Sequence, residues 1–157
     1  MHKVELKPIN PRIKELNAFP KKGTDGAAGY DVRYIGENTL TLNPGDRVKV
    51  PLGFAIHIGN PDIAAILMPR SGLGSKGLRL ANTIGLIDSD YQGEIAAVIE
   101  WHPLDKNDDL TSLTIEPGDR FIQMVFLPIV STDLGEVFEF TSSTQRGEGG
   151  YGSTGVK

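Results

Sequence analysis

The stretch LTIEPGDRF at residues 113–121 decides the fold class, because LTLNPGDRV at residues 40–48 nearly repeats it. Each stretch has the pattern of a short strand, a Pro-Gly turn and a second strand. Proline followed by glycine suits the two central positions of a type II turn. The repetition predicts two units in equivalent places in the two halves of a β-sandwich. A strand followed by a Pro-Gly turn is also a common unit, so similarity alone leaves a coincidental repeat open.

Short strand patterns and frequent turns fill the rest of the chain. Alternating or continuous apolar segments predict strands at residues 3–7, 30–35, 40–42, 47–50, 53–58, 63–68, 78–80, 94–101, 113–115, 121–127 and 137–140. Residues 21–29 and 102–110 have the composition of loops. No amphipathic helix of three turns is present, and 19 Gly and 10 Pro supply the turns. The sequence therefore predicts an all-β fold, a sandwich or a barrel.

Composition narrows the function classes. The chain has 157 residues, enough for one domain with its own core, and a net charge of −4. That charge argues against general nucleic-acid binding, which needs a basic surface. The absence of cysteine excludes disulfides and thiolate chemistry. The N-terminus lacks the apolar region of a signal peptide, and no apolar run approaches the about 20 residues of a membrane helix. We expect a cytoplasmic location and no membrane partner.

Two strands are too apolar for a small monomeric sandwich. Residues 63–68 are apolar throughout, and Gln123 alone interrupts the apolar run at residues 121–127. Such a pattern is typical of strands covered on both faces. We therefore expect an oligomer in which a neighbouring subunit covers the second face.

The segment GLIDSDYQG at residues 85–93 concentrates polar groups at a turn between two strands. Glycines at both ends permit backbone conformations that strain other residues. Carboxylates held at such a turn have a structural role or form a site. On spacing alone, Asp88 and Asp90 are equal candidates for a catalytic base.

The glycine-rich C-terminus, RGEGGYGSTG at residues 146–155, has features of a phosphate-binding segment. Its backbone N–H groups can close around phosphate oxygens, and Ser153 and Thr154 add hydroxyl donors. Arg146 can bind a phosphate with two hydrogen bonds, and Tyr151 can stack on a base. A terminal tail of linker composition is the alternative interpretation.

Arg70 and Ser71 follow a predicted buried strand at a glycine turn, where an anion could bind. A nucleophilic serine needs a partnering base. None of the three histidines, at positions 2, 57 and 102, lies in a segment that resembles a site. We therefore interpret Ser71 as a ligand contact, with a surface turn as the alternative.

Together, five segments of this kind resemble, in order, the five motifs of the homotrimeric dUTPase family. They are residues 28–31, 69–72, 82–93, 120–123 and 146–155, and the resemblance runs from about Ala27 to Gly155. It implies a jelly-roll-like β-barrel that forms a homotrimer, with active sites at the subunit interfaces. It also implies hydrolysis of dUTP to dUMP and diphosphate with Mg²⁺, which keeps uracil out of DNA and supplies dUMP for dTMP synthesis.

The resemblance also implies a role for each matching residue. Asp88 would be the general base that activates water, Tyr91 would pack against the deoxyribose, and Asn82 would bind the uracil edge. Asp31 would help to hold the water shell of Mg²⁺, with a structural role as the alternative. The remaining substrate-binding residues implied by the motifs are Arg70, Ser71, Gly72, Gly85, Gln123, Arg146, Tyr151, Gly152, Ser153 and Thr154. We expect Arg120 to pair with an acid instead of contacting the substrate, and we leave it out of the site.

The resemblance implies a barrel domain over residues 1–140 and a glycine-rich arm over residues 141–157. Two other functions stay open. One is a dCTP deaminase-type enzyme of the same fold, and the other is a dUTP-binding regulatory module with a protein partner. Asp88 and Tyr91 together with the complete tail favour the diphosphatase.

The loop at residues 102–112 looks longer than usual, and its composition is that of a solvated loop or of a partner-binding segment.

Overall fold

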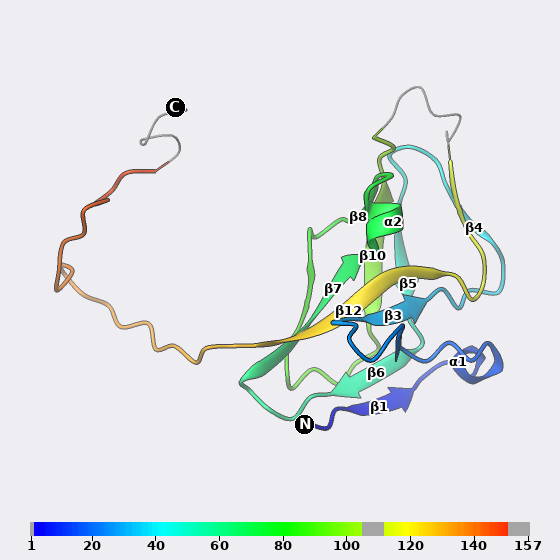
Figure 1. Ribbon diagram of the computed structural model, residues 1–157, viewed down its shortest axis with the longest axis horizontal. Coiled ribbons are helices and arrows are strands. Elements are labelled where there is room, and N and C mark those ends of the chain that lie inside the picture. Colours follow the sequence, from blue (N-terminus) through cyan, green and yellow to red (C-terminus); the bar gives the residue numbers. More distant parts are fainter. Residues whose placement is uncertain (1, 105–111, 151–157) are drawn as a thin grey trace.

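A computed structural model describes residues 2–104 and 112–150 of the chain (Figure 1). The described residues form short strands and two helices of one turn each. In chain order the elements are β1 (Glu5–Pro8), α1 (Arg12–Glu15), β2 (Lys21–Lys22), β3 (Tyr30–Arg33), β4 (Leu40–Leu42), β5 (Arg47–Pro51), β6 (Phe54–His57), β7 (Ile63–Pro69), α2 (Ser71–Gly74), β8 (Leu78–Leu80), β9 (Gly85–Ile87), β10 (Ala96–Trp101), β11 (Leu113–Ile115) and β12 (Arg120–Pro128). The predicted all-β class is confirmed. Neither helix is long or apolar enough to cross a membrane.

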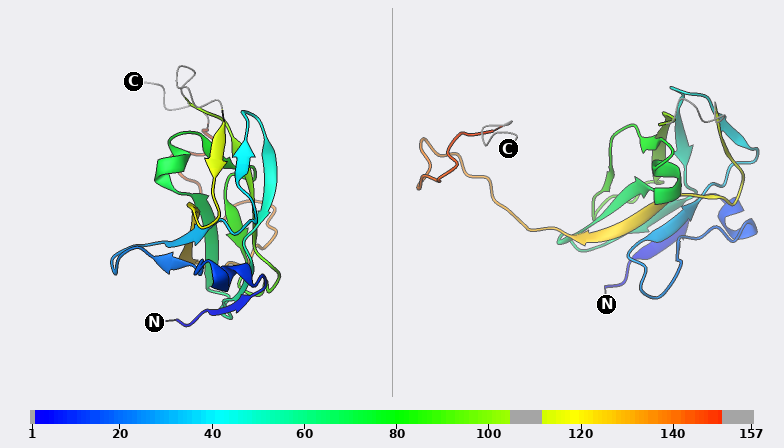
Figure 2. Two further views of the ribbon diagram at one scale, coloured as in Figure 1. Left: turned by 90° about the vertical axis from the view of Figure 1, so that its right-hand side faces the viewer. Right: turned by 45° about the horizontal axis from the view of Figure 1, so that its top comes forward.

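The strands form four antiparallel sheets around one core. The largest has the order β2-β3-β12-β7-β9, and a second has the order β5-β10-β8. The pairs β11-β4 and β1-β6 complete the body, as the two views in Figure 2 show. Phe54, Trp101 and Phe121 are the largest fully buried side chains of the core. The inward apolar residues of the strands other than β2 therefore pack into a single hydrophobic core.

The two repeated stretches pair with each other. β4 and β11 are antiparallel neighbours, with Leu42 opposite Leu113 and Leu40 opposite Ile115. A Pro-Gly turn follows each strand, and each turn has the expected hydrogen bond across it. The Asp46 N–H donates to the Asn43 carbonyl, and the Asp119 N–H donates to the Glu116 carbonyl, both at 2.9 Å. The two units therefore share the strand and turn that the repeat predicts, and their first strands pair in one two-stranded sheet. Their placement in two halves of a sandwich stays a prediction.

Both turns require glycine. Gly45 and Gly118 have φ values of 87° and 95°, and a Cβ built on either would meet nothing within 4 Å. Alanine at either position would thus be strained by its backbone conformation alone, by about 1–2 kcal/mol.

We expect Gly45→Ala and Gly118→Ala to lower the free energy of unfolding by similar amounts in urea titrations. Gly26→Ala, with open space and no positive φ, is the control; an equal loss there would contradict this explanation.

Two expectations about individual strands were wrong. Residues 137–140 form no strand, and Phe138 and Phe140 are almost fully exposed. An apolar strand needs a partner, and this segment has none within the described chain. Residues 21–29 are not entirely loop, because Lys21 and Lys22 pair with β3.

An extended arm leaves the body after β12. The Ile129 N–H donates to the Asp62 carbonyl at 2.8 Å, and beyond that bond the arm runs away from the sheets (Figure 1, orange to red). Every residue from 130 to 148 is exposed. The sheets therefore end at Pro128, whereas the domain boundary at residue 140 stays a prediction.

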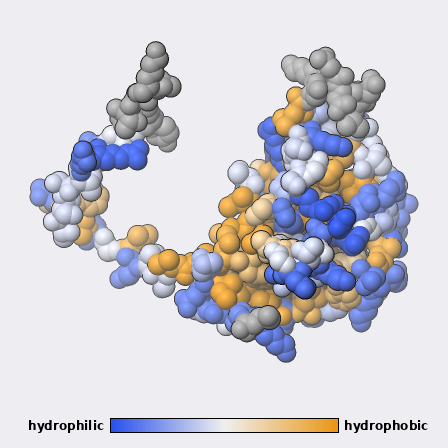
Figure 3. Space-filling view, in the orientation of Figure 1, coloured by the Kyte–Doolittle hydropathy of each residue, from blue (hydrophilic) through white to orange (hydrophobic). Residues whose placement is uncertain are grey.

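The outer face of the largest sheet is apolar and incompletely covered. Ile66 and Val125 stand opposite each other on it, and Leu86 follows on β9. Leu86 is 57% exposed and Leu127 39% exposed. Figure 3 shows apolar residues gathered where the arm leaves the body. Within the single chain Ile66 and Met68 of β7 are only half-buried on this face, so the expectation that a neighbouring subunit covers it stays a prediction.

Candidate functional site

Three strands bring together a cluster of two arginines and one acid. On the largest sheet, Gln123 of β12 lies between Asp31 of β3 and Met68 of β7. Arg70, directly after β7, therefore lies near Asp31 and donates from Nε to its Oδ1 at 2.7 Å. Arg120 donates from Nη1 to Oδ2 of the same carboxylate at 3.0 Å. The cluster holds one net positive charge where β12 begins and β7 ends.

This cluster clarifies the roles of two residues. Arg120 pairs with an acid, as expected. The Asp31 carboxylate has one oxygen on each arginine, so its first role in this structure is to hold both guanidinium groups. Among residues 2–104 and 112–150, no group of three His, Asp or Glu side chains could hold a metal ion.

The other predicted phosphate contacts surround the cluster. Ser71 and Gly72 begin α2 and are exposed. The Gln123 amide donates from Nε2 to the Pro69 carbonyl at 3.3 Å, which directs it toward the end of β7. A Cβ on Gly29 would lie 3.3 Å from Gln123 Oε1, so a side chain there would disturb this position. The structure therefore brings Arg70, Ser71, Gly72, Gln123 and Asp31 together.

A second group forms at the turn after β9. The Tyr91 N–H donates to the Asp88 carbonyl at 3.2 Å, and the Gly59 N–H donates to the Ser89 carbonyl at 3.2 Å. These bonds fix the backbone, while the Asp88 side chain is exposed and free to meet a ligand. Asp90 is exposed as well, and both acids line one groove beside residues 57–61. The geometry of one chain therefore does not distinguish the two carboxylates.

The Tyr91 ring is held in a defined position. Its hydroxyl donates to the Glu94 carbonyl at 3.1 Å. A Cβ on Gly93 would lie 2.5 Å from that hydroxyl, so only glycine permits this arrangement. Tyr91 is 44% exposed, which leaves it accessible to a ligand.

Asn82 lies upstream of this turn, between β8 and β9, and is exposed. Gly85 follows it at the start of β9, where a Cβ would lie 2.9 Å from the Cβ of Leu67. Glycine thus allows β9 to lie close against β7. The segment from Asn82 to Tyr91 therefore runs along the edge of the largest sheet.

The Arg70 cluster and the Asp88 turn lie at opposite ends of β7. Ile87 is opposite Ala65 in the antiparallel pair, so Asp88 continues toward the start of β7, whereas Arg70 follows its end. Six residues of strand, at about 3.3 Å each, separate the two ends by about 20 Å. One chain alone therefore does not bring all predicted site residues together.

The predicted arm residues lie only partly within the described structure. Arg146 is exposed and donates from Nε to the Gly149 carbonyl at 2.8 Å, within a turn of the arm. The expected roles of Tyr151, Gly152, Ser153 and Thr154 fall outside the described residues. All proposed contacts of the arm stay predictions.

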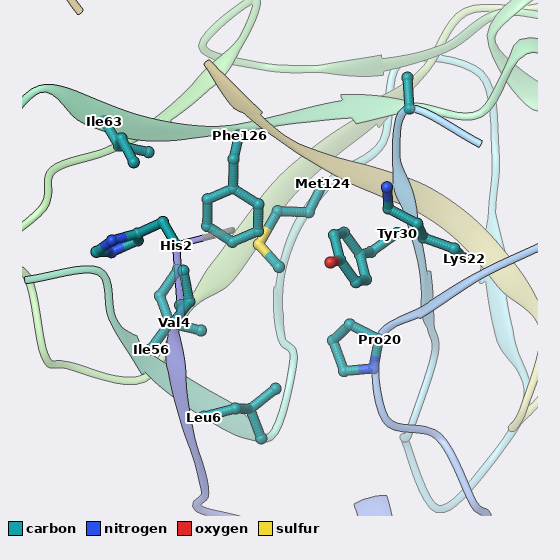
Figure 4. A pocket seen from close by; sticks show the side chains of 11 residues that line it. His2, Val4, Leu6, Pro20, Lys22, Tyr30, Ile56, Ile63, Met124 and Phe126 are labelled. Carbon is teal, nitrogen blue, oxygen red and sulfur yellow. The ribbon is translucent and has the colours of Figure 1, made fainter. Parts of the chain in front are cut away.

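Sequence reasoning did not predict an apolar groove of about 330 Å³ beside β1 (Figure 4). The rings of Tyr30 and Phe126 meet edge to face in it, with centroids 5.9 Å apart. His2 and Lys22 lie at the groove as its basic members. Its lining comes from strands far apart in the sequence, so no local pattern could have indicated it. It contains none of the predicted site residues.

Comparison with known proteins decides the family. The sequence profile of the dUTPase family matches residues 17–155. The chain belongs to the dUTPase family. The match covers all five segments on which the resemblance was based.

Relatives of this dUTPase-family chain match it from end to end. The deoxyuridine 5'-triphosphate nucleotidohydrolase of Cronobacter sakazakii is 45% identical over 158 residues, covering 100% of this chain and 99% of the relative. That of Citrobacter koseri is 46% identical with the same coverage. Among solved structures, a Staphylococcus bacteriophage 80alpha dUTPase with dUpNHpp has a TM-score of 0.79 and 26% identity, covering 99% of this chain and 100% of that one.

Proposed function

We propose that this protein hydrolyses dUTP to dUMP and diphosphate. The observation that carries the proposal is the full-length identity of 45% to a curated deoxyuridine triphosphate nucleotidohydrolase. The chain also has an acid at a rigid, exposed turn, which the reaction requires. By this activity the enzyme keeps uracil out of DNA and supplies dUMP for dTMP synthesis.

In this proposal Asp88 is the general base. A carboxylate whose backbone is fixed at both sides can accept a proton from water and orient that water in line with the α-phosphorus. Tyr91 packs its ring against the deoxyribose, where the bond to Glu94 keeps it from turning aside. A ribose would bring its 2′-hydroxyl against this ring, so the same contact selects the deoxy sugar.

The Arg70 cluster binds the phosphate chain. Arg70 and Arg120 share one carboxylate, so a positive charge is left for an anion. Ser71 and Gly72 offer donors at the same place, and Gln123 lies next to the α-phosphate. From the arm, Arg146, Ser153 and Thr154 bind the γ-phosphate, while Tyr151 stacks on uracil and Gly152 allows the close approach of the backbone.

The proposed reaction uses Mg²⁺, which neutralises charge on the phosphates. The described residues fit an ion that is held mainly by the substrate, because the Asp31 carboxylate already binds two arginines. Mg²⁺ commonly keeps several waters and binds through substrate phosphates. Asp31 would therefore contact the water shell and not the ion itself.

We infer a homotrimer in which several subunits build each active site. The separation of about 20 Å between the Arg70 cluster and the Asp88 turn along β7 supports this arrangement. The half-covered outer face with Ile66 and Val125 provides an apolar surface for a second copy. The exposed arm has Phe138 and Phe140 available to pack on a neighbour.

A nucleotide panel tests the proposal. Incubation with dUTP, dCTP, dTTP and UTP in the presence of Mg²⁺ should release diphosphate from dUTP alone. Ammonia from dCTP would instead indicate the deaminase-type enzyme. Tight binding of dUTP without any product would indicate the regulatory module, whose protein partner would then have to be found.

Asp90 is the competing base, and its substitution separates the two acids. We expect Asp90→Asn to change kcat for dUTP by no more than about threefold, because the family motif gives the base role to Asp88. Steady-state diphosphate release measures this effect. If Asp90→Asn lowered kcat as much as Asp88→Asn does, the assignment of the base role to Asp88 alone would be wrong.

A further inference from the structure

The position of the Tyr91 ring depends on the peptide group that follows Glu94. The Tyr91 hydroxyl donates to the Glu94 carbonyl at 3.1 Å. On the other side of the same peptide group, the Ile95 N–H donates to the Phe54 carbonyl of β6 at 3.0 Å. Because a trans peptide group is planar, its N–H and its C=O point in opposite directions. The bond to β6 therefore directs the Glu94 carbonyl toward the Tyr91 hydroxyl.

The Glu94 side chain joins the same two segments a second time. Its carboxylate oxygen Oε1 accepts the Gly53 N–H at 3.1 Å, one residue before Phe54. The Leu52 N–H donates to the Ile95 carbonyl at 2.9 Å. Of the bonds that hold Glu94 and Ile95 to this bend between β5 and β6, the one to Gly53 depends on a side chain. A substitution of Glu94 therefore removes that bond and leaves the backbone bonds available.

Gly53 is a fixed point of the fold. It is buried, and its carbonyl accepts the N–H groups of Ile9 and Asn10 at 2.8 Å and 3.1 Å. Its φ is 77°, and a Cβ at this position would overlap Cδ1 of Ile35. A buried backbone N–H that loses its acceptor costs free energy. Without the Glu94 carboxylate, this bend would therefore shift or admit water, and the peptide group bonded to it would move as well.

We propose that Glu94 is a positioning residue that determines how strictly the site selects deoxyribose over ribose. This inference rests on the proposed function, in which the Tyr91 ring lies where a 2′-hydroxyl would be. A ring that is held at its hydroxyl excludes that group, whereas a ring that can turn aside makes room for it. Glu94 acts through its own peptide group and not through contact with the nucleotide.

Two substitutions separate the hydrogen bond from the charge of Glu94. Glu94→Gln keeps a side-chain oxygen that can accept the Gly53 N–H, whereas Glu94→Ala removes the acceptor. We expect Glu94→Ala to lower the ratio of kcat/KM for dUTP to kcat/KM for UTP about tenfold, because small displacements of a positioning group have large effects. Glu94→Gln should stay within about twofold of the wild type. Steady-state release of diphosphate measures these ratios, and calorimetric titration with dUMP and UMP measures the corresponding affinities.

Asp46→Ala is the matched control for a general loss of stability. The Asp46 carboxylate also accepts a backbone N–H, that of Asn43 at 2.8 Å, in the turn between β4 and β5. Its substitution should leave the ratio unchanged. Hydrogen exchange of the Gly53 amide tests the bond itself and needs no substrate. Glu94→Ala should accelerate this exchange about tenfold, while Asp46→Ala should not change it.

Tyr91→Phe tests the last step, because it removes the hydroxyl but keeps the ring. If Glu94 acts through that hydroxyl, Glu94→Ala should lower the ratio by less than about twofold in the Tyr91→Phe background. An unchanged ratio in Glu94→Ala, an equal fall in Glu94→Gln, or an undiminished effect of Glu94→Ala in the Tyr91→Phe background would overturn the inference. A wild type that binds dUMP without hydrolysing dUTP refutes the proposed function, while the affinity ratios and the exchange of the Gly53 amide still decide the role of Glu94.

Discussion

Asp88→Asn should reduce kcat for dUTP by between about a hundredfold and ten-thousandfold, the usual contribution of a general base. The amide has the same shape as the carboxylate but cannot accept the proton of the attacking water. The bonds that fix this turn come from backbone groups of Tyr91 and Gly59, so the substitution leaves the fold unchanged. Steady-state release of diphosphate measures the loss.

Binding distinguishes a base from a structural acid. We expect Asp88→Asn to bind the non-hydrolysable analogue dUpNHpp with an affinity within about threefold of the wild type, measured by calorimetry. Asp90→Asn is the matched control, because it removes a charge from the same turn. Equal losses of binding and turnover in Asp88→Asn would show that Asp88 supports the turn instead of the reaction.

The strands could be predicted because their patterns are local. Alternating or apolar runs with Gly and Pro between them marked most strands to within two residues, as at Leu40–Leu42 and Leu78–Leu80. The repeat predicted two similar units of strand and Pro-Gly turn, and the first strands of the two units pair as β4 and β11. The sequence did not predict β2, because two adjacent lysines have neither the alternating nor the apolar pattern of a strand. Residues 137–140 have the pattern of a strand, yet strand formation depends on a partner that local sequence does not specify.

The site was predictable only as a set of residue types. The motifs named Asp31 and Arg70, but the ion pairs among Asp31, Arg70 and Arg120 depend on the register of β3, β12 and β7. That register is a property of the whole sheet. The bond between Gly53 and Glu94 was likewise hidden, because its two ends lie on segments far apart in the sequence. Contacts between such segments have no local sequence signal.

Deletion of residues 146–157 should reduce kcat/KM for dUTP by at least about a hundredfold while the body stays folded. The deletion removes Arg146 and the predicted contacts of Tyr151, Ser153 and Thr154 with the γ-phosphate and uracil. Charge-assisted contacts to phosphate and correct positioning each account for losses of this size. Steady-state kinetics with dUTP and Mg²⁺ measure the effect, and deletion of Val156 and Lys157 alone is the control.

Stability and assembly should be unaffected by the same deletion, because the arm is hydrogen-bonded to the body only where the arm begins, far from residue 146. The Ile129 N–H bonds to Asp62, whereas residues 130–148 are exposed and contribute nothing to the core. The shortened chain keeps Phe138 and Phe140, so any packing of this segment on a second copy would be preserved. We therefore expect an unchanged melting temperature and an unchanged sedimentation coefficient. Dissociation or unfolding of the shortened protein would show that residues 146–157 belong to the assembly and not only to the active site.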